Sequence, residues 1–152
     1  MFNQQLIAER LELIRSSVLR LKTLTGMSLE DFQGNEDAQD IAENRLRKAL
    51  EALFDLGRHI AVKSGAGIPH DYRSVVAMLS EKDILPADFC HKITGMAGYR
   101  NRLIHEYNKV TVPELYDILQ TKLSDFELFC QYIVKYLYSK IFDKTIEKSH
   151  FE

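Results

Sequence analysis

Hydrophobic residues recur at steps of three and four through most of this 152-residue chain, which is the spacing of amphipathic helices. The first such stretch covers residues 2–25 and stops at Gly26. A second covers 38–63, and the two glycines and one proline in 64–69 interrupt it. We therefore predict two long helices, joined by a loop over 27–37.

The second half of the chain repeats this pattern. A short periodic stretch covers residues 71–80, and a longer one begins at Pro86 and runs to about Tyr107. The last helix is predicted to open at Thr111, because Glu114 stands three positions further on, at the spacing of a capping box. The pattern predicts an all-α fold, an up-and-down four-helix bundle with an additional short helix.

Composition fits one compact domain, since 45% of the residues are hydrophobic and 28% are charged. We expect a single domain over residues 1–152, with a core over about 4–142 and a tail after Phe142 that frays. The formal net charge of -2 provides no global basic field, so any contact with nucleic acid must come from a local patch.

The location and the metal content are also predicted from composition. Cys90 and Cys130 are isolated thiols, and the N-terminus lacks the pattern of a secretory signal, so a cytoplasmic location is expected. No apolar run approaches the roughly 18 residues that a membrane span needs. The histidines lack the spacing of a metal site, and we predict no bound metal.

The segment 99–107 contains the residues most suited to chemistry. On a helical wheel, Arg100 falls near the middle of the apolar stripe of its helix, where an unpaired charge is costly unless a cleft opens beside it. Two alternatives are that its side chain reaches solvent at the edge of the stripe, or that it pairs with a structural carboxylate.

Asn101 and His105 lie four residues apart and share a second helix face with the small residues Thr94 and Gly98. Such a face allows another backbone or a ligand to come close. A neutral imidazole can accept a proton near neutral pH, and a guanidinium can hold phosphate oxygens, so the set suits phosphate chemistry. Because Arg100 and His105 point about 140 degrees apart on an ideal helix, either Arg100 reaches around the helix or a second copy of the chain completes the site.

These residues resemble the motif of a HEPN domain, and more narrowly of the HepT class of toxins from HepT–MntA toxin–antitoxin pairs. The motif is Arg-x4-His-x-Tyr, formed by Arg100, His105 and Tyr107. Residues 42–53, the connector from Gly67 to Arg73, and the Ile-Leu-Pro at 84–86 resemble the family in the same order. The likeness covers roughly residues 4–138.

The resemblance implies a homodimer in which two motif helices meet across a two-fold cleft. It implies a metal-independent endoribonuclease without a cofactor, cleaving RNA such as tRNA or mRNA. His105 would act as general base or acid at a ribose 2'-hydroxyl, Arg100 would bind the scissile phosphate, and Asn101 would orient the site. The implied partner is an MntA-like nucleotidyltransferase antitoxin that silences the toxin by transferring AMP to Tyr107.

Two other functions stay open on the sequence. The chain could be an inert HEPN module that only binds a nucleotidyltransferase partner or a nucleotide, or a subunit in which Tyr107 is only an acceptor. Arg102 is an RNA-binding candidate, with a solvated salt bridge as its alternative role. A basic cluster on the second helix could follow an RNA backbone or simply cover a helix face. Its members are Arg45, Arg47 and Lys48.

Overall fold

The computed structural model describes residues 1–105 and 109–151, with side chains described as far as Ile141. These residues form helices only, in the order α1 (Gln4–Lys22), α2 (Leu29–Gln33), α3 (Glu36–Lys63), α4 (Tyr72–Glu81), α5 (Ala87–Ile104), α6 (Val112–Thr121) and α7 (Leu123–Phe151). The prediction of an all-α fold is confirmed. None of these helices is long and apolar enough to cross a membrane.

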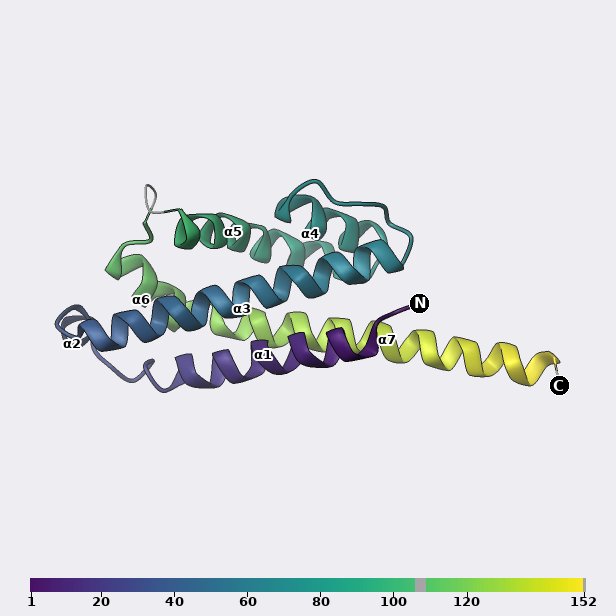
Figure 1. Cartoon of the computed structure of the whole chain (residues 1–152), viewed down its shortest axis with the longest axis horizontal. Helices are drawn as coiled ribbons and strands as arrows, with labels where there is room; N and C mark the ends of the chain where they lie inside the picture. The colour runs from purple at the N-terminus through teal and green to yellow at the C-terminus, as the bar shows by residue number, and fades with distance from the viewer. Residues whose placement is uncertain (106–108, 152) are drawn as a thin grey trace.

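The bundle is built around α3, which packs against all six other described helices. In Figure 1, α1 and α7 lie on one side of α3, and α4 and α5 lie on the other. The part of α3 between Ala42 and Ala61 presents a continuous apolar stripe, which is fully buried at Leu46, Leu53 and Ile60. The C-terminal part of α7 continues as a helix well beyond the bundle (Figure 1).

The predicted loop over 27–37 is wrong in one respect, because it contains the short helix α2. The Ser28 hydroxyl caps this helix by accepting a hydrogen bond from the Asp31 backbone N–H at 3.1 Å. Phe32 anchors it in the core at 0% exposure, with its ring centroid 5.7 Å from that of Tyr116. A five-residue helix shows too little periodicity to be found in a sequence pattern.

The predicted last helix is divided into α6 and α7 at Lys122. The capping box at its start is present, with Thr111 and Glu114 bonded to each other's backbone N–H groups. At its end the Thr121 hydroxyl donates to the Asp117 carbonyl at 2.8 Å, a bond to the preceding turn that often bends a helix. The predicted domain limits and the fraying of the tail stay predictions.

Gly57 fixes how closely α4 approaches α3. A Cβ at this position would stand 2.9 Å from Val75 Cγ1 and 3.3 Å from Leu79 Cδ1, both on α4. We expect Gly57→Ala to destabilise the protein by about 1–3 kcal/mol through overpacking, although alanine is the better helix former by about 1 kcal/mol. Urea denaturation measures the change.

The matched control for this prediction is Gly26→Ala, because a Cβ on Gly26 meets no atom within 4 Å. Its free energy of unfolding should stay close to that of the parent protein. Equal effects of the two substitutions would show that close packing of α4 on α3 does not depend on Gly57.

Candidate active site

Helix α5 positions Arg100 and Asn101. It begins after Pro86, which stands at the N-cap, and Asp88 lies favourably in its first turn. Phe89, Ile93, Met96 and Ala97 are buried against the bundle, as the apolar stripe predicts. The helix is therefore fixed in rotation about its axis, and so are the side chains that follow Ala97.

Arg100 lies half-buried, with its guanidinium carbon 4.4 Å from the centroid of the Tyr72 ring. Among the described residues it forms no salt bridge, and its Nε atom is buried without a hydrogen-bond partner. The alternative of pairing with a structural carboxylate is therefore not observed in this part of the chain. A guanidinium held against an aromatic ring and left without an anion is suited to bind one.

Asn101 is exposed and lines a pocket of about 340 Å³ between α5, α4 and α3. On the same side of α5 the helix is uncovered at Gly98, since a Cβ built on this residue meets no described atom within 4 Å. The contact face expected from the sequence is thus open in the described part of the chain, and nothing in that part tests whether a second copy covers it.

His105 is exposed and stands just past the end of α5, which differs from the predicted helix end near Tyr107. Its backbone N–H still donates to the Asn101 carbonyl at 3.0 Å, but its ψ of 115° turns the chain out of the helix. The ideal wheel therefore applies only as far as Ile104. Tyr107 lies outside the described residues, so its role as the residue that accepts AMP stays a prediction.

Arg102 is engaged in an ion pair with Glu114 of α6. Its two terminal nitrogens donate to the carboxylate at 2.6 and 2.9 Å, and one of them also donates to the Lys109 carbonyl at 3.1 Å. These hydrogen bonds from Arg102, with further ones from Thr111, lower the pKa of Glu114 to about 2. The salt bridge weighed for Arg102 is present, and a contact with RNA stays untested.

The residues of the basic cluster of α3 point to different sides of the helix. Arg47 donates to Asn44 at 2.9 Å and pairs with Glu51 at 3.7 Å, so its charge is already shared along the helix. Arg45 and Arg47 are two residues apart in a continuous helix and point roughly 200 degrees apart. Lys48 is three residues from Arg45 and lies on the same side of the helix, and whether any of the three residues contacts RNA stays a prediction.

Four residues near Arg100 were not among the candidates from the sequence. They are Arg58, His70, Tyr72 and Arg73, and all line the same pocket as Asn101. The connector containing Tyr72 and Arg73 had been noted only for its resemblance to a family. Nothing in the sequence pattern indicated that Arg58, some forty residues before Asn101, would meet it.

The described residues thus form a helical bundle in which a guanidinium without an anionic partner among them, an amide and an imidazole lie around the end of one helix. The family model described as Ribonuclease HepT-like matches residues 9–133. The chain belongs to this family, as its motif and the order of its other segments predicted.

Two curated relatives are similar over most of the chain. The "tRNA nuclease HepT" of Aphanizomenon flos-aquae is 29% identical over 132 residues, covering 87% of this chain and 90% of the relative. The "mRNA nuclease HepT" of Shewanella oneidensis is 24% identical over 128 residues, covering 84% of this chain and 96% of the relative.

A solved structure shares the fold. It is the tri-AMPylated HEPN toxin of Shewanella oneidensis in complex with an MNT antitoxin, with a TM-score of 0.79 and 23% sequence identity. The match covers 88% of this chain and 99% of that chain. The predicted HEPN-like fold is therefore confirmed.

Proposed function

We propose that this protein is the ribonuclease toxin of a toxin–antitoxin pair and cleaves RNA without a metal ion. The observation that carries the proposal is Arg100, which lies on Tyr72 with no anion among the described residues. Asn101 is beside it, and His105 follows one turn later with an exposed side chain. The family and the named activities of the two curated relatives support the same function.

In the proposed reaction, His105 accepts the proton of a ribose 2'-hydroxyl. The 2'-oxygen forms a bond to phosphorus, the bond from phosphorus to the 5'-oxygen breaks, and the leaving oxygen takes up a proton. Arg100 binds the non-bridging oxygens as negative charge develops on them, and Asn101 orients the phosphate. DNA lacks the attacking hydroxyl and would not be cleaved.

We further propose that the site forms between two copies of the chain. The open face of α5 at Gly98 would let a second α5 approach closely, because this residue has no side chain to hold it away. A homodimer would then bring the two motif segments together across a cleft. A monomer that cleaves RNA at the full rate would contradict this arrangement.

Metal independence can be tested directly. We expect the purified protein to cleave an unstructured oligoribonucleotide at the same rate in EDTA as in magnesium, and to leave a 2',3'-cyclic phosphate. The all-deoxy oligonucleotide of the same sequence is the control and should remain intact. Cleavage that stops in EDTA would contradict the proposed chemistry, and an absence of cleavage in both buffers would favour an inert HEPN module.

The partner is proposed to be a minimal nucleotidyltransferase antitoxin that transfers AMP from ATP to Tyr107. The supporting observation is the fold shared with a tri-AMPylated HEPN toxin in complex with an MNT antitoxin. A nucleotide on this hydroxyl would add negative charge beside the cleft and repel an RNA phosphate. Both cysteines are unpaired, which fits a reducing cytoplasm as the site of the pair.

We expect Tyr107→Phe to remove labelling by radioactive ATP and the antitoxin while leaving RNA cleavage intact. Tyr138→Phe is the matched control, because Tyr138 is 69% exposed on α7 and lies far along the chain from the motif. Mass spectrometry of the labelled protein measures both. Full labelling of the Tyr107→Phe variant would show that another residue is the acceptor.

A further inference from the structure

The pocket beside Asn101 is basic and has no role in the cleavage step described above. Its lining contains three groups that carry or can carry positive charge, namely Arg58 on α3, His70 before α4, and Arg73 in the first turn of α4. All three are exposed, and neither arginine forms a salt bridge among the described residues. Its volume of about 340 Å³ is at the lower end of the range for small-ligand sites.

Asp71 is the one acidic residue in this lining, and its carboxylate is already used. It accepts hydrogen bonds from the Ser74 backbone N–H at 2.8 Å and from the Ser74 hydroxyl at 2.7 Å, which cap α4. These hydrogen bonds lower the pKa of Asp71, and the bond from the Ser74 hydroxyl has the largest effect. The carboxylate thus serves the helix start, while the two arginines remain available to a ligand.

The aromatic residue of the pocket does not offer a stacking surface for a base. The Tyr72 ring lies 4.8 Å from the ring centroid of Phe54, and the Arg100 guanidinium lies over it at 4.4 Å. A nucleobase would have to displace one of these contacts. The pocket therefore favours a phosphate over a base. Its two arginines form no salt bridge among the described residues, and its aromatic ring is already in contact with Phe54 and Arg100.

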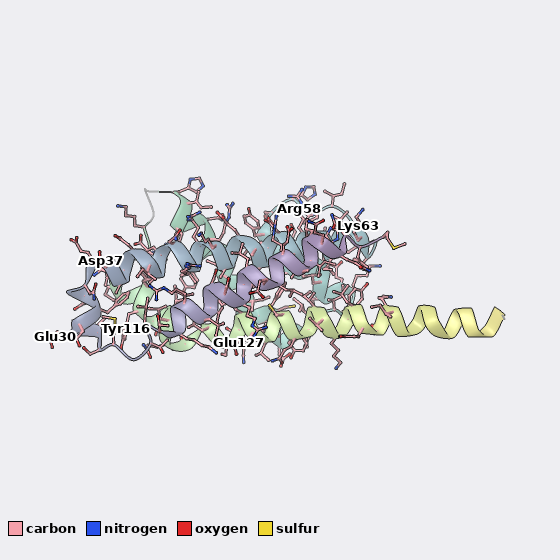
Figure 2. All side chains as sticks on the ribbon, turned by 60° about the horizontal axis from the view of Figure 1, so that its bottom comes forward. Glu30, Asp37, Arg58, Lys63, Tyr116 and Glu127 are labelled. Carbon is pink, nitrogen blue, oxygen red and sulfur yellow. The ribbon has the colours of Figure 1, made fainter. Side chains whose placement is uncertain are left out.

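The surroundings favour one direction for a bound strand. On the other side of the C-terminal part of α5, Leu103 shares a pocket with the acidic residues Asp40 and Glu43. The one basic residue in the lining of that pocket, Arg47, is paired with Glu51 at 3.7 Å. Figure 2 places Glu30 and Asp37 at one end of the bundle, and Arg58 and Lys63 toward the other. A polyanion that passes His105 and Asn101 therefore meets favourable charge only if it continues toward Arg58.

We infer that Arg58 and Arg73 form a subsite for the RNA phosphate next to the scissile one, and so place the strand across Arg100. The inference rests on the proposed function, because it assigns a role at the same site. The two arginines bind substrate and take no part in proton transfer. They are expected to determine affinity for oligonucleotides rather than the rate of the chemical step.

The test compares the double variant Arg58→Gln/Arg73→Gln with the control Arg20→Gln/Lys135→Gln, which removes the same charge from exposed positions on α1 and α7. Each is assayed on a dinucleoside monophosphate, which has only the scissile phosphate, and on a hexanucleotide. KM, kcat and the salt dependence of KM are measured, together with binding of an uncleavable 2'-deoxy hexanucleotide. Circular dichroism checks that both variants are folded.

For the hexanucleotide, the double variant should raise KM about tenfold with kcat unchanged. The slope of log KM against log salt concentration should fall by about 0.7, the value for one phosphate contact on a single strand. For the dinucleoside monophosphate it should match the parent. Equal losses on both substrates would place the arginines at the scissile phosphate and overturn the subsite. Unchanged hexanucleotide kinetics would overturn it while leaving the ribonuclease function intact.

The binding measurement separates the remaining outcomes. If the parent protein cleaves nothing but binds the hexanucleotide through Arg58 and Arg73, the proposed cleavage is wrong, and the two arginines bind an RNA phosphate without the adjacent scissile site. If the parent protein binds no hexanucleotide, both proposals are overturned.

Discussion

His105→Ala is expected to lower the rate of RNA cleavage by about 10²–10⁴-fold, the range that a positioned general acid or base contributes. His105 stands at the exposed end of α5, and the described structure gives its side chain no hydrogen-bond partner. Its removal should therefore cost little stability. The rate is measured on an oligoribonucleotide under single-turnover conditions, so that product release does not hide the effect.

His91→Ala is the matched control, because His91 is also an exposed histidine on α5 but lies near the opposite end of the helix. It should cleave as fast as the parent protein. Sedimentation of both variants tests whether the proposed dimer forms, since loss of that dimer would also lower the rate. Unchanged cleavage by a folded, dimeric His105→Ala protein would remove His105 from the mechanism.

The helices could be predicted from the sequence because most of them bury a wide apolar face. The apolar stripe of α3 predicts that helix, and Pro86 and Thr111 predict where two others begin. Each of these signals comes from residues that are close together in the sequence. Besides the division of the last predicted helix at Lys122, two features could not be predicted. The five residues of α2 depend on the burial of Phe32, and the end of α5 at Ile104 depends on a backbone turn that no pattern of side chains indicates.

The candidate site was predictable only along its own helix. Arg100, Asn101 and His105 are close in sequence, and their residue types suit phosphate chemistry. The pocket that extends this site depends on residues from α3 and α4, which the fold brings together because Gly57 lets the two helices pack closely. Contacts between distant segments of this kind follow from tertiary packing and not from periodicity.

Substitutions of Arg100 and Arg102 should have different effects, although the two arginines are only two residues apart in the motif segment. Arg100→Ala is expected to lower cleavage by about 10²–10³-fold, as for the loss of one group that stabilises charge in the transition state. Its stability should change little. The contact with Tyr72 is worth about 0.5–1 kcal/mol, and the buried Nε atom without a partner disappears with the side chain.

Arg102→Ala should have the opposite result, a lower melting temperature with kcat retained. Arg102 joins α5 to the Glu114 carboxylate of α6 and to the Lys109 carbonyl, and thereby holds the two ends of the connection between the helices. Arg100→Lys refines the comparison. It keeps the charge but loses the planar fork that binds two phosphate oxygens, so its rate should lie between those of the parent and Arg100→Ala.

Thermal melting and single-turnover cleavage of the same three variants test this separation. Equal losses of activity in Arg100→Ala and Arg102→Ala, each in proportion to lost stability, would mean that Arg100 is structural and that the site lies elsewhere. A selective loss in Arg100→Ala would instead show that Arg100, beside Tyr72, binds the substrate's phosphate. The half-buried guanidinium would then be retained for catalysis, since the bundle gains little stability from it.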